Sequence, residues 1–368
     1  MVNDMIRLGD VATYTNGYAF KPEDRGEVGL PIIRIQDLTG NAYDLGFYDG
    51  EYPEKIEIND GDVLISWSAS LGVYVWNRGR ALLNQHIFKV EFDKVDIDKN
   101  YFVYAVRQKL VEMGMKTHGA TMKHIVKKDF DATLIPYPSL NKQTEIATNL
   151  NNVSRVIEAR KQELQLLDNL IKARFVEMFG DPVSNSMNLP EATLPELGEF
   201  GRGVSKHRPR NAPELLGGAY PLVQTGEVAA SDLYIMSYTS TYSEFGFQQS
   251  KMWDKGTLCI TIAANIAKTA ILGFDACFPD SIVGFNANEK TDNIFIHYWF
   301  SFFQSILEAQ APESAQKNIN LKILSELKVI VPSMVKQKEF IAFVQQVDKS
   351  KFVRRRGYLP NSRKCCIS

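Results

Sequence analysis

The chain repeats a pair of motifs at a constant spacing of 194 residues, because Lys317 follows Lys123 and Pro332 follows Pro138 by that number. The first copy reads ATMKHI at 120–125 and PSLNKQ at 138–143, and the second reads AQKNI at 315–319 and PSMVKQ at 332–337. A unit of this length is several times longer than a solenoid repeat. The duplication therefore predicts two related domains in one chain.

Each copy carries the signals of a mixed domain. In the first copy, β-rich runs at 31–35, 62–67, 71–76 and 87–92 predict strands, and helical spacing predicts a helix over 100–115. In the second copy, strands are expected near 220–224, 258–263 and 269–274, and a helix over 294–310. We therefore predict an α+β fold with two similar mixed α/β domains, at 1–140 and 195–333.

A long heptad pattern separates the two domains. No Gly or Pro occurs from 141 to 179, and Gly180 with Pro182 ends the helix. Its apolar seam consists of Ile146, Leu150, Val153, Ile157, Leu164, Leu167, Ile171 and Met178. The pattern predicts a coiled-coil helix over 141–180, followed by a polar linker over 181–194. An amphipathic helix packed on its own domain is the alternative.

The heptad pattern begins again in a second helix, predicted over 334–353, where Phe340, Val344 and Val347 repeat the seam at the same offset. Position 351 is Lys, where the first copy has Ile157, and the basic tail at 354–368 contains Gly357 and Pro360. This tail resembles a frameshift product. The expectation is a shortened second helix that leaves the first seam, from Ile157 to Met178, without a partner.

Composition and motifs narrow the function. No apolar run approaches about 18 residues, and the start lacks a signal-peptide pattern, so a cytoplasmic protein without a membrane span is expected. The four cysteines lack metal-binding spacing, and neither a phosphate-binding loop nor a Gly-x-Ser-x-Gly elbow occurs. No catalytic or metal-binding residue is therefore predicted.

Polar and basic residues recur at equivalent ends of the two domains, where they suit contacts with phosphates and base edges. The net charge of −1 argues against a strongly basic DNA-binding surface, but the cations are clustered. The candidate DNA-binding residues are Arg34, Gln36, Ser68, Gln85, His86, Thr121, Lys123, His124, Lys206, Arg208, Arg210, Gln316, Lys317 and Asn318. Arg34 and Gln36 are expected on one face of a strand. Solvent-exposed loops without a ligand are the alternative for each group.

The order of these motifs resembles a known family. LGD at 8–10, GLPIIR at 29–34, GDVLIS at 61–66 and PSLNKQTEI at 138–146 precede a coiled-coil helix, and the arrangement is duplicated. This is similar to the specificity subunit of type I restriction-modification systems, over nearly the whole chain. The shortened second helix departs from that family's pattern.

The resemblance implies two target-recognition domains that each read half of a split site in double-stranded DNA. It also implies two antiparallel helices that set the spacing of the half-sites, with the seam residues as a subunit interface. Modification subunits would dock on these helices and carry the S-adenosylmethionine chemistry. A restriction motor-nuclease subunit would use ATP and Mg²⁺, and this chain would hold no cofactor and no catalytic residue. A non-DNA scaffold or adaptor for protein or carbohydrate is the main alternative, and a cryptic nuclease is the weakest.

Overall fold

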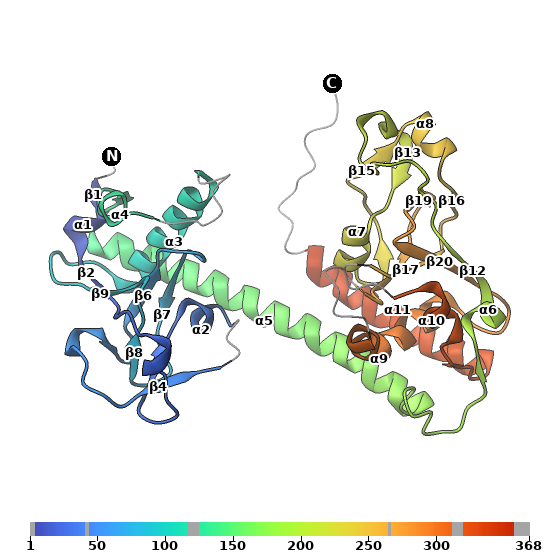
Figure 1. Cartoon of the computed structure of the whole chain (residues 1–368), viewed down its shortest axis with the longest axis horizontal. Helices are drawn as coiled ribbons and strands as arrows, with labels where there is room; N and C mark the ends of the chain where they lie inside the picture. Colours follow the sequence, from blue (N-terminus) through green and yellow to red (C-terminus); the bar gives the residue numbers. More distant parts are fainter. Residues whose placement is uncertain (1–3, 41–43, 117–124, 264–265, 311–318, 357–368) are drawn as a thin grey trace. The chain divides into compact units, whose positions relative to one another are not determined.

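The structure is a computed structural model that describes residues 4–40, 44–116, 125–263, 266–310 and 319–356 (Figure 1). It divides into two compact units, Met1–Glu158 and Ala159–Ser368. The boundary falls within helix α5 (Leu140–Phe179), so each unit contains part of this helix.

The first unit is built on two four-stranded sheets. One has the antiparallel order β2 (Thr13–Asn16), β9 (Ile87–Glu91), β6 (Val63–Ser66), β7 (Gly72–Val75). The other has the order β4 (Gly46–Tyr48), β3 (Leu30–Ile33), β8 (Ala81–Leu83), β5 (Glu57–Ile58), with β3 parallel to β8. A short pair, β1 (Met5–Arg7) with β10 (Leu134–Pro136), accompanies them. The helices are α1 (Leu8–Val11), α2 (Ile35–Thr39), α3 (Lys99–Lys116), α4 (Lys127–Asp131) and the 3-10 turns η1 (Pro22–Asp24) and η2 (Glu54–Ile56).

The second unit repeats this plan with one added strand. Its larger sheet has the order β12 (Gly198–Arg202), β20 (Ile282–Ala287), β17 (Leu258–Thr261), β18 (Thr269–Leu272), β14 (Tyr234–Ile235). Its smaller sheet has the order β15 (Ser240–Tyr242), β13 (Leu216–Leu222), β19 (Ala276–Cys277), β16 (Met252–Trp253), and β11 (Glu191–Ala192) pairs with β21 (Val329–Ile330). The helices are α6 (Leu194–Leu197), α7 (Thr225–Ala230), α8 (Glu244–Gln248), α9 (Asn293–Gln310), α10 (Leu321–Glu326), α11 (Met334–Arg356) and the 3-10 turn η3 (Pro213–Leu215).

Equivalent residues make equivalent contacts in the two units. The side-chain amide of Gln143 donates to the Pro138 carbonyl at 2.8 Å, and Gln337 donates to the Pro332 carbonyl at 2.8 Å. Both glutamines are buried at the start of a long helix. They fix the turn that leads from the strand into the helix, which explains why this motif is repeated. The predicted fold class, with two related α/β halves and two long helices, is confirmed.

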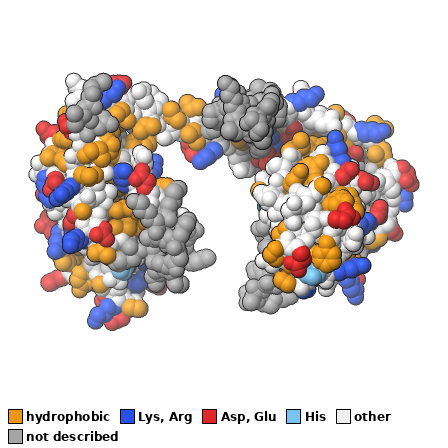
Figure 2. Space-filling view, turned by 90° about the horizontal axis from the view of Figure 1, so that it is seen from above, with side chains coloured by type: hydrophobic (Ala, Val, Ile, Leu, Met, Phe, Trp, Pro, Cys, Tyr) orange, Lys and Arg blue, Asp and Glu red, His pale blue; other side chains and the backbone are white. Residues whose placement is uncertain are grey.

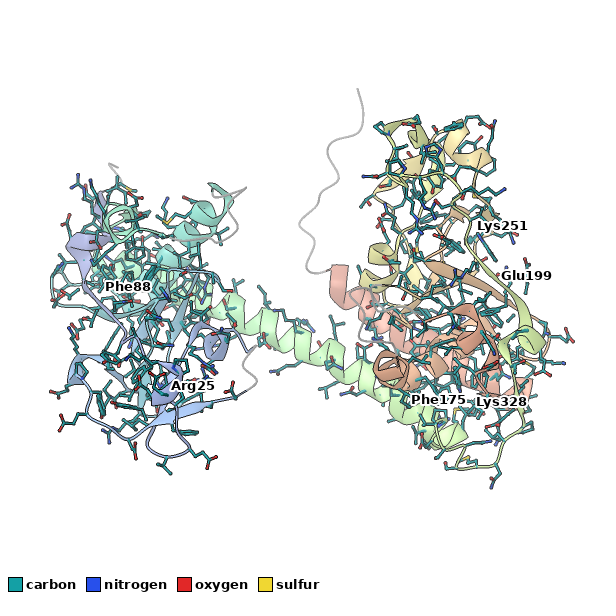
Figure 3. The ribbon with its side chains drawn as sticks, viewed as in Figure 1. Arg25, Phe88, Phe175, Glu199, Lys251 and Lys328 are labelled. Atoms are coloured by element: carbon teal, nitrogen blue, oxygen red, sulfur yellow. The ribbon has the colours of Figure 1, made fainter. Side chains whose placement is uncertain are left out.

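Each core contains a cluster of aromatic residues among more numerous aliphatic ones, and Figure 3 labels one member of each cluster, Phe88 and Phe175. In the first unit, Phe88 of β9 packs against Tyr14 of β2 and Phe130 of α4. In the second unit, Phe175 of α5 lies against Phe295 of α9 and Phe340 of α11, with ring centroids 5.3 Å apart in each case. The second part of α5 is therefore integral to the core of the second unit.

Helices α5 and α11 run antiparallel where they meet. Arg174 pairs with Glu339 at 3.0 Å, while the earlier residue Asp168 pairs with the later residue Lys351 at 2.5 Å. The start of α11 thus lies beside the end of α5. The expectation of an unpartnered seam from Ile157 to Met178 was wrong for its later part, because Ile171 is fully buried and Leu167 and Met178 pack on the same core. In an antiparallel pair, a short second helix uncovers the beginning of the first helix rather than its end. That the second helix is shortened stays a prediction.

The placement of Arg34 and Gln36 was predicted wrongly, although the strand before them exists as β3. Arg34 and Gln36 do not share a strand face, because β3 ends at Ile33 and α2 begins at Ile35. The backbone N–H of Arg34 donates to the Asp37 carboxylate at 2.8 Å, which closes the first turn of α2. An alternation of only three residues cannot distinguish a strand from a capped helical turn.

Candidate nucleic-acid interface

In the first unit, three connections meet where strand β9 begins. They follow β2, β6 and β8, and they carry Tyr18, Trp67 and Gln85. The N–H of Gln85 donates to the Tyr18 carbonyl at 2.9 Å, and the N–H of Trp67 donates to the His86 carbonyl at 3.2 Å. We call these three connections the first loop cluster.

Gly17 makes this close approach possible. A Cβ atom at Gly17 would lie 2.1 Å from the carbonyl oxygen of Asn84. His86 adopts φ = +72°, an uncommon conformation for a residue with a side chain. With this backbone geometry, the side chain of the neighbouring residue Gln85 is exposed to solvent.

The side chains of the first loop cluster combine packed aromatic rings with polar groups. Trp67 stacks on Phe88, its indole N–H donates to Asn16 Oδ1 at 3.2 Å, and its ring meets that of His86 edge-on. The buried Nδ1 of His86 has no hydrogen-bond partner among the described residues. Tyr18 is 47% exposed. These groups offer an aromatic surface and hydrogen-bonding groups to a ligand.

The predicted residues of this unit divide into two groups. Gln85 and His86 lie in the first loop cluster, whereas Ser68 lies beside Trp67 but is buried. Arg34 is engaged within the fold by ion pairs with Asp37 at 3.2 Å and Asp44 at 3.5 Å. Gln36 is exposed on α2. Sequence reasoning missed Tyr18, although its position directly after Gly17 was a usable signal for a tight turn.

The second unit has an equivalent arrangement, the second loop cluster, formed by the described residues of three connections, at 203–212, at 262–263 with 266–268, and at 278–281. A Cβ atom at Gly203 would lie 2.3 Å from the Phe278 carbonyl oxygen, as at Gly17. The N–H of Ile262 donates to the Ser281 carbonyl at 3.0 Å, as Trp67 does to His86. The same backbone framework thus carries different side chains.

The three predicted cations of this unit lie in the 203–212 connection. Arg208 and Arg210 both pair with Asp280, at 3.3 and 2.6 Å. Asp280 occupies the position equivalent to Gln85, so it partly neutralises the two arginines. Lys206 is exposed, and no carboxylate of a described residue lies within ion-pair distance of it. Lys206 is therefore the cation of this group most available to a phosphate.

Six predicted residues lie outside the described part of the chain, namely Thr121, Lys123, His124, Gln316, Lys317 and Asn318. The residues that follow these two segments are described. The N–H of Ile125 donates to the Trp67 carbonyl at 3.0 Å, and the N–H of Ile319 donates to the Ile262 carbonyl at 3.0 Å. The described residue that follows each of these segments, Ile125 or Ile319, is therefore hydrogen-bonded to the loop cluster of its own unit.

The predicted seam residues differ in exposure along α5. Leu150 and Val153 are 38% and 55% exposed, and Ile146, Ile157 and Leu164 are half-buried. On α11, Phe340, Val344 and Val347 are buried against the second part of α5. Val156 and Leu166, which were not predicted, are also exposed, at 59% and 67%. The middle of α5 thus displays an apolar surface.

The described residues show no cluster of three or more metal-ligating side chains and no helix long and apolar enough to cross a membrane. Burial raises the pKa of the Cys259 and Cys277 thiols, so both stay protonated near neutral pH. On the surface, basic and acidic side chains are intermixed in the visible face of each unit (Figure 2). On this visible face, the mixed charges offer local contacts and do not form one large basic patch.

Comparison with known proteins gives consistent results. The profile of the type I restriction modification DNA specificity domain matches the chain twice, at residues 3–169 and 191–354. The type I restriction enzyme EcoBI specificity subunit of Escherichia coli is 25% identical, over 93% of this chain and 78% of its own length. A putative type I restriction enzyme MjaX specificity subunit of Methanocaldococcus jannaschii is 21% identical, over 93% of this chain and 85% of its own length.

Solved structures share the fold. The S subunit of a type I restriction-modification system from M. genitalium superposes with a TM-score of 0.55 at 15% identity, over 96% of this chain and 91% of that one. A chain from a structural study of complex assembly and conformational transition in a type I R-M system gives a TM-score of 0.53 at 16% identity, over 96% and 92%.

Proposed function

Because the chain belongs to the type I restriction modification DNA specificity family, we propose that each of its two units reads one half of a bipartite DNA site. The first loop cluster would contact one half and the second loop cluster the other. A split site needs two reading surfaces held at a fixed separation, as in dimeric DNA-binding proteins.

One observation carries this proposal: the two loop clusters share a backbone framework and differ in their side chains. Trp67, Gln85 and His86 correspond to Ile262, Asp280 and Ser281. Gln is suited to bidentate contact with adenine, and a carboxylate can accept from cytosine N4. Two unlike half-sites require two equivalent backbone frameworks that carry different side chains.

The two long helices have the complementary role. The apolar surface of α5 around Val153 and Val156 is a suitable docking site for modification subunits. In this proposal those subunits hold S-adenosylmethionine and methylate adenine. A restriction subunit holds ATP and Mg²⁺, and this chain contributes recognition without catalysis.

The test is DNA binding by the chain in complex with its modification subunits, measured against salt concentration. Lys206→Ala should weaken binding to all duplexes and reduce the salt slope by about one. The matched control is Lys290→Ala, an exposed lysine between β20 and α9 at the opposite end of β20. It should change neither quantity.

Base readout is tested separately by mapping the methylated sites of each variant. Gln85→Ala should relax one half of the recognition sequence and leave the other half intact. Binding of the complex that does not respond to salt would instead favour a scaffold for protein or carbohydrate. Relaxation of both halves by Gln85→Ala would contradict the assignment of one unit to one half-site.

A further inference from the structure

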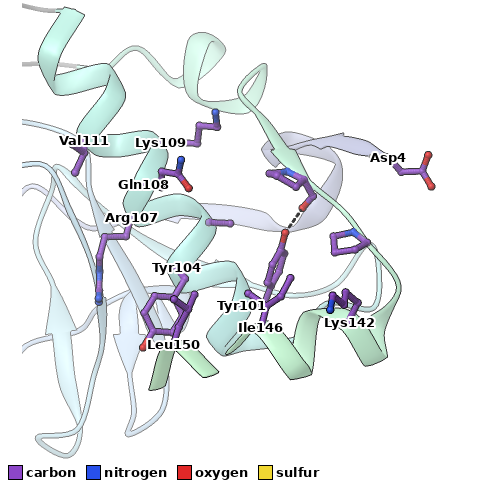
Figure 4. A pocket seen from close by; sticks show the side chains of 13 residues that line it. Asp4, Tyr101, Tyr104, Arg107, Gln108, Lys109, Val111, Lys142, Ile146 and Leu150 are labelled. Atoms are coloured by element: carbon purple, nitrogen blue, oxygen red, sulfur yellow. Dashed lines mark hydrogen bonds between the residues drawn. The ribbon is translucent and has the colours of Figure 1, made fainter. Parts of the chain in front are cut away.

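The first unit contains an open groove of about 620 Å³ between α3 and the beginning of α5 (Figure 4). Its walls are Tyr101, Tyr104 and Gln108 from α3 and Ile146 and Leu150 from α5. These five residues define the first groove. Figure 4 shows them facing one shared space, with Tyr101 donating to the Pro136 carbonyl at its edge.

The second unit contains the same groove in a filled state. At the 194-residue offset, the five residues correspond to Phe295, Tyr298, Phe302, Phe340 and Val344, which we call the second groove. Residues at this offset also make the same backbone contacts. The N–H of Phe102 donates to the Asp98 carbonyl, and the N–H of its counterpart Ile296 donates to the Asp292 carbonyl. Both helices α3 and α9 therefore begin at equivalent residues.

The side chains that fill the second groove come from the second part of α5. The ring of Phe175 lies 5.3, 5.1 and 5.3 Å from the rings of Phe295, Phe302 and Phe340. Phe179 lies 5.3 Å from Phe295 and 5.7 Å from Phe340. With Ile171, these residues form an apolar stripe with a spacing of four, which is one face of a helix.

Exposure shows the difference between the grooves. Val344 and Phe340 are fully buried, whereas their counterparts Leu150 and Ile146 are 38% exposed and half-buried. Covering apolar surface of this kind is favourable by about 25 cal/mol per Å². The first groove therefore has both the shape and the apolar lining to bind a helix.

We propose that the first groove binds an amphipathic helix of a separate polypeptide. This helix carries large apolar side chains at three positions spaced by four, on the pattern of Ile171, Phe175 and Phe179. The proposal does not depend on DNA reading, because it rests on the internal repeat alone.

Charge adds a further requirement. In the second groove, Arg174 precedes Phe175 and pairs with Glu339 at 3.0 Å. The counterpart of Glu339 is Glu145, which is exposed beside the first groove and pairs with Lys142 at 2.8 Å. By the same repeat, a basic residue directly before the middle apolar residue of the partner helix would face Glu145, where it would compete with Lys142.

Neither of the two nearer sources fits. A second folded copy of this chain cannot offer Ile171, Phe175 and Phe179, because all three are fully buried in its own second unit. Residues 357–368 contain Gly357 and Pro360, and Pro is incompatible with a helix interior. These residues also lack the apolar spacing of four.

The test uses the full chain and a fluorescent peptide with the sequence of residues 163–180 as the probe helix. The peptide should bind saturably, and a scrambled peptide should not. Val111 of α3 also lines the groove. Val111→Glu combined with Leu150→Glu should reduce the affinity about tenfold or more, because each change places a charge in the groove. Both positions are exposed, at 54% and 38%, so the fold should tolerate the changes.

The matched control is Val28→Glu, an exposed apolar residue of the same unit that does not line the groove. It should leave peptide binding unchanged. Orientation is tested by charge exchange: Glu145→Lys should weaken the peptide, and the peptide with Arg174→Glu should regain affinity for that variant.

Three results would overturn the proposal. The first is no binding, or binding that the groove variant leaves unchanged. The second is binding only after deletion of residues 357–368, which would make those residues the occupant. The third is self-association that the groove variant abolishes, which would make a second copy the occupant.

Discussion

Phe175 provides the strictest test of how α5 is anchored in the second unit. The side chain is fully buried and has four aromatic neighbours, Phe179, Phe295, Phe302 and Phe340, with ring centroids 5.0 to 5.3 Å away. Removing a buried phenylalanine side chain costs about 3–5 kcal/mol, through lost transfer energy and the cavity that remains. We expect Phe175→Ala to destabilise the second unit by that amount.

The assay is thermal and urea unfolding of the purified chain. For a unit of this size, each 1 kcal/mol shifts the midpoint by about 2–4 °C, so the expected loss is roughly 6–20 °C. The control is the adjacent residue Val176, which is 40% exposed, and Val176→Ala should cost less than about 0.5 kcal/mol. A cost for Phe175→Ala no larger than that of the control would refute the assignment of Phe175 to the core.

Two predictions concern pH. Burial, assisted by the positive charge of Lys351, lowers the pKa of His297 to about 4; the neutral form is thus favoured in the folded state, and stability should fall as pH drops from about 6.5 towards 4. The variant His297→Gln can still hydrogen-bond to Thr269 and should remove this loss. The prediction is contradicted if the unfolding free energy of the variant falls between pH 7 and pH 5 by as much as that of the unmodified protein. Hydrogen bonds from Arg80 and Tyr52 lower the pKa of Glu57 to about 2, so this contribution is present above about pH 4.5 and is lost as pH falls towards 2. Arg80→Ala should flatten the acid dependence of the first unit over that window, and an unchanged acid titration would rule out the ion pair as its cause.

The features predicted correctly from the sequence were those that depend on local periodicity. The helix predicted over 141–180 corresponds to α5, which ends at Phe179, and the helix predicted over 294–310 corresponds to α9. Both were predictable because apolar spacing along a helix is visible in a single segment. The repeated Pro-to-Gln motif located equivalent turns in both units. The resemblance to type I specificity subunits rested on the same repeated motifs, and the family comparison confirms it.

The errors arose where the answer depended on tertiary partners. Arg34 was assigned to a strand, but its partners Asp37 and Asp44 place it at the start of α2. Arg208 and Arg210 looked unopposed in sequence, whereas Asp280 lies about 70 residues later and faces both. The expectation that the later part of the α5 seam lacks a partner was wrong for a geometric reason. A heptad pattern shows which face of a helix is paired, but it does not show which part of that face an antiparallel partner covers. The DNA-binding role of every predicted residue stays a prediction.

The central claim is that two units on one chain read two different half-sites. It is tested most directly by sequencing methylated adenines in a host that carries this chain with its modification subunits. The account predicts one recognition sequence with two specified parts of different sequence, separated by a gap of fixed length and unspecified bases. A single continuous recognition sequence, or two parts whose separation varies from site to site, would contradict it.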